Sequence, residues 1–313
     1  MNLQQFRYVR EVAKRGLKVS EAALALHTSQ PGISKQIREL EDELGVGIFV
    51  RQGRRFTALT DAGREILGGI ERILDDIARL RAIGQEFSAA ARGSLAVAVT
   101  HTQARYALPP VVTEFKRRYP AVHLKLLQGN PHQLARHLLD GDADLAIATE
   151  ALVEYPELVT LPGYQWHHGV VVQVGHELAA VKRLTLEAIA RHPIVTYDPT
   201  FAGRTAVDRA FANRGLAPDI VLTALDSDVI KSYVALGLGV GIISEKAFRA
   251  AKDEGLVLLD AAHLFPAQTT RIAFKRGAYL RGFTMEFIRL FAPHLRAEDL
   301  KDLDAATREN FSI

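Results

Sequence analysis

Polar and basic side chains recur at helical spacing in the segment QPGISKQIR, near the N-terminus. They share one face of the predicted helix, opposite an apolar face. The polar face carries Gln30, Ser34, Lys35 and Arg38. An amide can pair with adenine, a hydroxyl with several bases, and the two cations can reach guanine or phosphate. This face therefore predicts a surface that binds double-stranded DNA.

A second basic group follows in GIFVRQGRRFTALT. Residues 48–50 and 55–59 are typical of two strands, and Gln52 with Gly53 is typical of the turn between them. The hairpin carries Arg51, Arg54 and Arg55. Such side chains suit the DNA backbone or the minor groove, so the hairpin is predicted to be the wing of a winged helix-turn-helix.

A third polar group lies where two apolar runs, SLAVAV and DLAIA, end. The first run leads into Thr100, Thr102 and Gln103, and the second into Thr149. In open parallel sheets, ligands bind beyond the carboxyl ends of the strands. The first group also begins a predicted helix, where free N–H groups and the helix dipole favour an anion. The pattern predicts a small anionic ligand, although hydroxyls that only cap a helix would have the same spacing.

The predicted DNA-binding side chains need three helices to position them. We expect a helix over residues 3–15, a short helix over 21–26 with Ser20 as its N-cap, and a third helix that ends at Gly45. Thr28 or Ser29 can cap the third helix, and Pro31 suits its first turn. All three are also predicted to contact DNA, together with the polar face of that helix. Residues 1–60 hold ten Lys/Arg and six Asp/Glu, a charge of +4 within a total of +3, which leaves −1 for the remainder. A helical bundle with a solvated basic hairpin is the alternative.

A long helix is predicted from Thr60, its cap, to about residue 87. An apolar seam with alternating spacings of four and three runs along it: Ile66, Ile70, Ile73, Ile77 and Leu80. Because nothing in the N-terminal module is expected to cover this seam, it predicts pairing with the same helix of a second chain. Packing against the C-terminal body is the alternative.

Beyond residue 92, apolar strands alternate with helices, as in parallel sheets. The pattern predicts two α/β lobes, with a late strand over 269–275 that returns to the first. The expected fold is a winged helix-turn-helix (1–59), a linker helix (60–92) and a two-lobed α/β effector domain (93–313) like a periplasmic binding protein. Lobe I would span about 93–162 and 268–295, and lobe II about 163–267.

Several protein classes are excluded or disfavoured. The chain of 313 residues has no cysteine, which excludes disulfides, thiolate metal sites and cysteine nucleophiles. The spacing of its histidines predicts no metal site, and no GxSxG or P-loop motif is present, so an enzyme is not expected. The N-terminus resembles no secretory signal and no run is long enough to span a membrane. We therefore predict a cytoplasmic protein with no membrane partner, not an exported solute-binding protein.

The segments SQPGISKQIRELEDELG (29–45) and LTDAG (59–63) resemble those of LysR-type transcriptional regulators. THTQARYALP (100–109), DLAIATEA (144–151) and DSDVIKSYVALGLGVGI (226–242) resemble the CysB-like branch of that family, the regulators of sulfur assimilation. The resemblance implies a homodimer or homotetramer that binds promoter DNA, contacts RNA polymerase and needs no cofactor. It also implies a small effector from sulfur metabolism: sulfate, thiosulfate, acetylserine or adenylyl sulfate.

The same resemblance implies effector contacts from Thr100, Thr102, Gln103, Thr149 and Trp166. This sequence departs from the family pattern in YDPTFAGR (197–204), where Ala202 stands in place of a threonine. Thr200 or backbone N–H groups are the expected substitutes for the missing hydroxyl contact. The predicted function is control of sulfur assimilation and cysteine biosynthesis genes. The alternative is a LysR-type regulator of another pathway, such as sulfonate use, with a different anionic ligand.

Overall fold

The computed structural model describes residues 1–53, 55–87 and 93–295, without the side chains of residues 82, 85–87, 150 and 202. Arg54 of the predicted wing, residues 88–92 of the predicted linker and the C-terminal residues 296–313 lie outside the described residues. The chain divides into two compact units, Met1–Phe87 and Ser88–Ile313. Among the described residues, no helix has the length and apolar character needed to cross a membrane.

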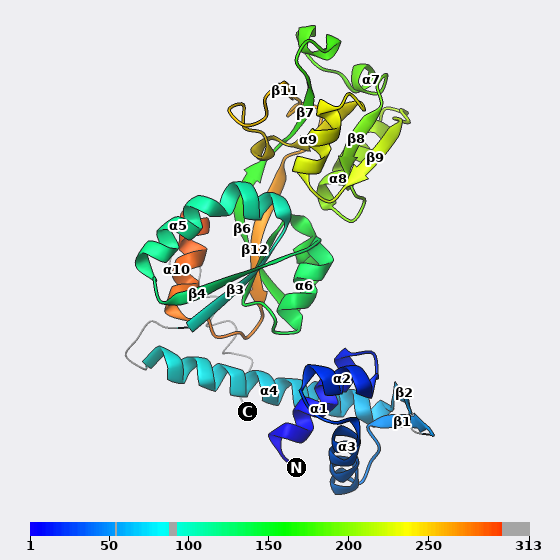
Figure 1. Cartoon of the computed structure of the whole chain (residues 1–313), viewed down its shortest axis with the longest axis vertical. Helices are drawn as coiled ribbons and strands as arrows, with labels where there is room; N and C mark the ends of the chain where they lie inside the picture. The colour runs from blue at the N-terminus through cyan, green and yellow to red at the C-terminus, as the bar shows by residue number, and fades with distance from the viewer. Residues whose placement is uncertain (54, 88–92, 296–313) are drawn as a thin grey trace. The chain divides into compact units, whose positions relative to one another are not determined.

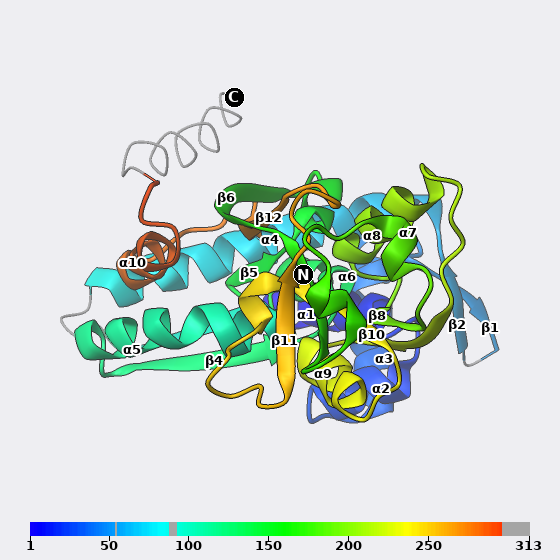
Figure 2. The ribbon, with the colours of Figure 1, turned by 90° about the horizontal axis from the view of Figure 1, so that it is seen from above.

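The first unit contains the expected helices and hairpin. Its elements are α1 (Leu3–Lys14), α2 (Val19–Ala25), α3 (Gln30–Leu44), β1 (Phe49–Gln52), β2 (Arg55–Leu59) and α4 (Asp61–Phe87). The apolar faces of the helices meet in one core, which includes Val9, Val12, Ile33, Ile37 and Leu40. The β1–β2 hairpin projects from the helices in both views (Figure 1, Figure 2).

Two of the predicted N-caps are present in the first unit and one is not. The Ser29 hydroxyl accepts a hydrogen bond from the Gly32 N–H at 3.2 Å, and the Thr60 hydroxyl accepts one from the Gly63 N–H at 2.7 Å. Ser20, in contrast, lies inside α2, and the cap position belongs to Lys18, whose side chain makes no capping bond. The prediction failed because Gly16 and Leu17 both adopt left-handed backbone conformations, with φ of 59° and 68°, and α2 starts directly after this turn.

The apolar seam on α4 is partly used within the first unit. Ile70 is 3% exposed and Leu74 is 6% exposed, and both belong to the core of this unit, against which Ile66 also packs. The expectation that nothing in the module would cover the seam was therefore wrong for its first half. The second half differs, since Ile73 is 41% exposed and Leu80 is 67% exposed.

The second unit consists of two lobes. The sheet of lobe I has the strand order β4-β3-β5-β12-β6 in the described part of the chain. Its strands are β3 (Gly93–Val99), β4 (Val122–Gln128), β5 (Leu145–Ala148), β6 (Leu158–Trp166) and β12 (Gln268–Lys275). Helices α5 (Leu108–Arg118) and α10 (Gly282–Phe291) cover one face, and α6 (Pro131–Leu139) covers the other (Figure 1).

The sheet of lobe II has the order β11-β7-β10-β8-β9 in the described residues. Its strands are β7 (His168–Gln173), β8 (Ile194–Tyr197), β9 (Ile220–Ala224), β10 (Val240–Ser244) and β11 (Leu256–Asp260). Helices α7 (Leu186–Ile189) and α8 (Ala202–Ala212) pack on one face, and α9 (Ser227–Ala235) packs on the other. Short helical turns η2 (Glu150–Glu154), η3 (Glu177–Ala180) and η4 (Glu245–Ala247) complete the connections.

The sheets are mixed, whereas the alternation of strands and helices predicted parallel ones. β3 pairs in parallel with β4 and β5, but β12 runs antiparallel to β5 and β6, and β7 runs antiparallel to β10 and β11. Strands β6 and β11 were not predicted. β6 contains Pro162 and Gly163, which usually interrupt strands, and its register shifts there. Because β6 stays in lobe I up to Trp166, the chain first crosses between lobes at His167 and not near residue 163.

The helix predicted over residues 103–119 is divided into two parts. A π-helical turn, η1 (Gln103–Ala107), precedes α5, and the Leu108 N–H donates to the Gln103 carbonyl five residues earlier. Pro109 and Pro110 follow immediately and have no N–H groups for the bonds that an uninterrupted α-helix would need. The wider turn places Thr102, Gln103 and Tyr106 beside lobe II.

Candidate functional site

Helix α3 of the first unit presents the predicted DNA-binding face. Its buried residues are Ile33, Ile37, Leu40 and Glu41, while Gln30, Pro31, Lys35 and Arg38 are exposed and Ser34 is half-buried. Lys35 lies 3.7 Å from Glu39 in an exposed ion pair, which costs little to break. A polar, basic face opposite a buried apolar one has the chemistry to enter a DNA groove.

Two residues assigned to DNA contact also have local structural roles at the start of α3. The Ser29 hydroxyl is occupied as the N-cap of the helix. Thr28 is half-buried, and its N–H donates to the Ala23 carbonyl at 3.0 Å in the turn that joins α2 to α3. This turn includes His27, with a left-handed φ of 49°.

The wing is fixed to α3 by a buried carboxylate that the sequence did not suggest. Glu41 is 8% exposed, and its Oε1 accepts hydrogen bonds from the N–H groups of Ile48 at 2.8 Å and Phe49 at 3.1 Å. Its Oε2 pairs with the Arg51 guanidinium, which also lies 5.1 Å from the centre of the Phe56 ring. Arg51 is therefore paired within the module, although both Arg51 and Arg55 are exposed.

In the second unit, residues from both lobes enclose a small cavity of about 40 Å³. Its lining consists of Thr100, Thr102, Gln103, Thr149, Trp166, Tyr197, Phe201, Gly203 and Ser244. All five ligand contacts implied by the family resemblance are in this set. Four further residues, Tyr197, Phe201, Gly203 and Ser244, were missed. Tyr197 and Ser244 end the neighbouring strands β8 and β10 of lobe II, so the carboxyl-end rule applied to lobe I would also have found them.

The cavity offers a hydrogen-bond donor that has no partner in the described part of the protein. The Trp166 Nε1 atom is buried and makes no hydrogen bond. Thr100, Thr102 and Thr149 add hydroxyl groups to the lining of the same cavity. A buried donor without a partner is costly unless a ligand or water satisfies it. These atoms therefore indicate a ligand that accepts hydrogen bonds.

Gln103 is held in a fixed orientation. Its Nε2 donates to the Thr270 hydroxyl at 3.3 Å, and its Oε1 accepts from the Tyr164 hydroxyl. Both partners belong to lobe I, Thr270 to β12 and Tyr164 to β6, and the Gln103 residue itself is only 4% exposed. Because this amide is already fixed, it loses little conformational entropy when a ligand binds, and its fixed direction makes the site selective.

Backbone dipoles add a positive potential without any charged side chain. Thr100 directly precedes the helical segment that begins at residue 101, and Gly203 lies in the first turn of α8, whose N-cap Phe201 makes no capping hydrogen bond. Helix N-termini favour anions through their free N–H groups. No residue in the lining of the cavity carries a formal charge. The site is suited to a compact anion held by neutral donors.

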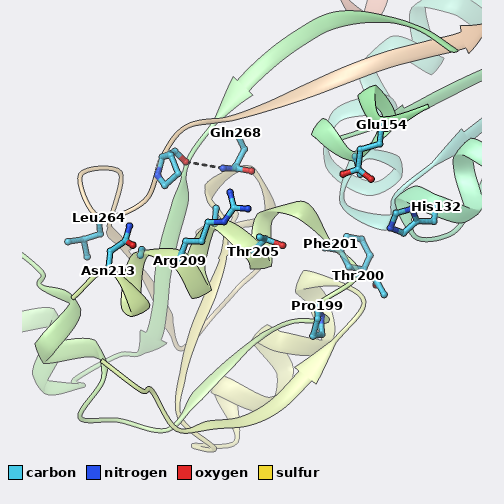
Figure 3. A pocket seen from close by; sticks show the side chains of 14 residues that line it. His132, Glu154, Pro199, Thr200, Phe201, Thr205, Arg209, Asn213, Leu264 and Gln268 are labelled. Atoms are coloured by element: carbon cyan, nitrogen blue, oxygen red, sulfur yellow. Dashed lines mark hydrogen bonds between the residues drawn. The ribbon is translucent and has the colours of Figure 1, made fainter. Parts of the chain in front are cut away.

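Thr200 does not line the small cavity, and the side chain of Ala202 is not described. The Thr200 hydroxyl donates to the Asp198 carboxylate at 2.7 Å and lies in the wall of a larger cavity, not of the small one. Ala202 begins α8, but its side chain lies outside the described residues. Figure 3 shows the larger cavity, about 630 Å³, with Thr205 and Arg209 on α8 and with His132 and Glu154 from lobe I.

The two units match two parts of one protein family. Residues 3–64 match the bacterial regulatory helix-turn-helix protein, lysR family, and residues 88–296 match the LysR substrate binding domain. The chain therefore belongs to the LysR family of bacterial transcriptional regulators, as the sequence motifs predicted. It is a DNA-binding regulator with a domain for a small-molecule effector, and its relatives are regulators and not enzymes.

Individual relatives are similar over nearly the whole length. The chain is 50% identical over 313 residues to the HTH-type transcriptional regulator CysB of Burkholderia cenocepacia, with 100% of both chains covered. It is 51% identical over 303 residues to SsuR of the same species, covering 97% of this chain and 98% of that one. The crystal structure of the cofactor-binding domain of the Cbl transcriptional regulator has a TM-score of 0.65 at 45% identity, over 67% of this chain and 92% of that chain. Within the LysR family, the chain is therefore closely related to CysB, SsuR and Cbl.

Proposed function

We propose that the chain controls genes of sulfur assimilation and cysteine biosynthesis in response to a small anionic effector bound in the 40 Å³ cavity. The observation that carries the ligand assignment is the buried Trp166 Nε1, which has no hydrogen-bond partner and lines a cavity that also meets the N-termini of two helical segments. The pathway assignment is supported by similarity to CysB and Cbl. Sulfate fits this chemistry best among the candidates, because it is compact and only accepts hydrogen bonds from the protein.

Thiosulfate, acetylserine and adenylyl sulfate remain candidate effectors, of which the last two are larger. Either of the larger molecules would place an anionic group among the donors and its remaining atoms in the adjoining 630 Å³ cavity. Phe201 lines both cavities and would separate the two parts of such a ligand. Comparing the binding of small and large effectors therefore tests whether one ligand occupies both cavities.

Transmission to DNA is proposed to occur through an oligomer. Ile73 and Leu80 on α4 would pair with the same helix of a second chain, and a homotetramer would present two pairs of wings to promoter DNA. Effector binding would change the angle between the lobes, and with it DNA bending and the access of RNA polymerase. The effector must bind the two states unequally to cause this change.

A regulator of sulfonate use is the second candidate, because the identity to SsuR, at 51%, is as high as the 50% identity to CysB to within one percentage point. The two functions differ in the promoters that are bound. Purified protein should be titrated against fragments from upstream of sulfate-assimilation genes and of sulfonate-use genes, at equal salt. Stronger retention of the sulfonate fragments would replace the first proposal with the second and leave the DNA-binding assignment unchanged.

The effector assignment is tested by the fluorescence of Trp166, the only tryptophan in the chain. Sulfate, thiosulfate, acetylserine and adenylyl sulfate are titrated in turn into wild-type protein and into a Thr100→Ala variant. We expect a saturable change with at least one ligand, and weaker binding of that ligand in the variant. If none of the four changes the emission of the wild type, the proposed effector class is wrong.

A further inference from the structure

The turn that carries the ligand-binding residues of lobe I continues into lobe II. Thr100, Thr102 and Gln103 line the small cavity, and η1 extends the same segment to residue 107. Tyr106 in η1 packs against the hydrophobic cluster of lobe II that includes Val171, Tyr197, Ile230, Val234 and Ile243. A side chain of one lobe is thus part of the core of the other.

The hydroxyl of Tyr106 is hydrogen-bonded on both sides by residues of lobe II. It donates to Asp228 Oδ1 at 2.5 Å and accepts from Lys231 Nζ at 2.9 Å. Lys231 is 5% exposed and also donates to the Ala247 carbonyl at 2.8 Å and to Asp253 Oδ1 at 2.7 Å. The ammonium of Lys231 is therefore fully hydrogen-bonded, and one of its three partners comes from lobe I.

Charges from both lobes alternate around this contact. From lobe I, Arg105 pairs with Asp228 at 2.6 Å, and His101 Nε2 lies 3.7 Å from the same carboxylate. Burial by itself lowers the pKa of Lys231, but the bonds to Asp253 and Tyr106 outweigh burial and raise it, so the lysine stays charged. Charge-assisted hydrogen bonds are stronger than neutral ones, so the bonds of Tyr106 to Asp228 and Lys231 give the lobes a strong polar contact.

A second chain of hydrogen bonds connects the contact with the ligand cavity. The Thr102 hydroxyl lies 3.3 Å from the Ser227 hydroxyl, which is 2.6 Å from the Tyr197 hydroxyl, and the latter accepts from the Ser244 N–H at 3.1 Å. Thr102, Tyr197 and Ser244 all line the cavity. Ser227 and Asp228 are adjacent residues at the start of α9, so the position of α9 affects both networks.

We propose that Tyr106, Asp228 and Lys231 form an inter-lobe latch that positions the ligand-binding turn against lobe II without touching the ligand. This inference rests on the proposed effector site. The latch joins η1 to α9, whereas the 630 Å³ cavity is lined by α8, on the opposite face of the lobe II sheet. When the effector binds, the lobes therefore move mainly on the α8 side. The latch sets the fraction of protein molecules whose lobes are already in the arrangement that binds the effector.

The latch itself is tested by distances between the lobes. Because the chain has no cysteine, spin labels can be placed at Lys125→Cys in lobe I and Lys182→Cys in lobe II, both exposed, and the distance measured by pulsed electron paramagnetic resonance. Tyr106→Phe keeps the ring and removes both hydroxyl bonds. Tyr155→Phe is the matched control, since it removes a hydroxyl contact of 2.8 Å to His132 within lobe I. We expect a broader distance distribution in the ligand-free Tyr106→Phe protein than in wild type or control. An unchanged distribution overturns the latch.

The positioning role is tested by sulfate affinity, measured by calorimetry on the same full-length variants. Tyr106→Phe and Asp228→Asn should weaken sulfate binding roughly three- to tenfold, because fewer molecules are in the binding-competent arrangement. Tyr155→Phe should bind like wild type. Unchanged affinity in Tyr106→Phe alongside a broadened distribution overturns the positioning role. If wild type does not bind sulfate, the proposed effector fails, while the distance measurement still decides whether the latch exists.

Discussion

At the scale of single residues, the proposed effector cavity is lined by uncharged side chains, and a glycine limits its size. Gly203 shows how little room there is. A Cβ at this position would lie 3.2 Å from His168 Nε2 and 3.3 Å from Trp166 Cη2, closer than most side-chain contacts. Because both rings are buried, they have little freedom to move away. The glycine therefore keeps the cavity open and holds Trp166 within it.

Replacing this glycine with a branched residue should remove effector binding. In Gly203→Val we expect sulfate affinity to fall more than about tenfold, because the added atoms fill the cavity or displace Trp166. Ala212→Val is a control on the same helix, at an exposed position outside the cavity. Calorimetry measures the affinity, and thermal unfolding shows whether the variant is folded. A folded Gly203→Val protein that binds sulfate like the control would contradict the assignment of the cavity.

His168 gives a pH-dependent prediction. Burial lowers its pKa from 6.5 to about 4, and neither ring nitrogen has a hydrogen-bond partner in the described residues. Below pH 6.5, His168 becomes protonated in the unfolded chain but stays neutral in the folded protein. Its contribution to the free energy of unfolding is therefore fully present above pH 6.5 and is lost as the pH falls toward 4. The loss should reach about 3 kcal/mol. Urea unfolding across this range measures it. In His168→Phe this part of the pH dependence should disappear; a curve parallel to that of wild type would refute the assignment.

At the scale of elements, apolar periodicity predicted most of the helices and strands, because burial of one face determines them. The failures have local causes. Pro162 and Gly163 concealed β6, and the Pro109-Pro110 pair changed the first turn of a predicted α-helix into a π-helical turn. In the candidate site, the residues after the lobe I strands were predicted, whereas Glu41 and Tyr106 were not. The role of Glu41 depends on the turn that brings the Ile48 N–H back to α3, and the role of Tyr106 depends on Asp228 in the other lobe, and helix or strand periodicity shows neither contact.

The exposed half of the α4 seam predicts how the chain associates. Ile73→Asp combined with Leu80→Asp should weaken pairing at least tenfold and leave a smaller assembly in sedimentation experiments, because charges would face the partner helix. The folded first unit should persist, since both side chains are substantially exposed. Ile70→Asp should instead lower the melting temperature sharply, because Ile70 is in the core. A sedimentation profile unchanged in the double variant would show that α4 does not form the interface.

At the scale of the whole molecule, recognition of DNA and recognition of the effector reside in separate units that use opposite electrostatic strategies. The first sixty residues carry a net charge of +4, and the rest of the chain carries −1. An excess of cations suits a polyanion whose binding is driven by release of counterions. The effector cavity instead has neutral donors, which suit a small ligand that must be distinguished from other anions. Variants should therefore separate the two functions.

Arg38→Ala should weaken promoter binding and reduce the slope of log affinity against log salt by about one, as expected when one phosphate contact is lost. Its sulfate affinity should match wild type, because Arg38 belongs to the first unit.

Thr149→Val removes a hydroxyl from the cavity and nearly keeps the shape of the side chain. This variant should keep the salt slope and the effector-free DNA affinity but lose the change in footprint that sulfate produces. Footprinting at several salt concentrations, with and without sulfate, measures all of these quantities. If Arg38→Ala keeps the wild-type slope, α3 does not contact phosphate through this side chain; if Thr149→Val keeps the sulfate response, the cavity is not the source of the signal.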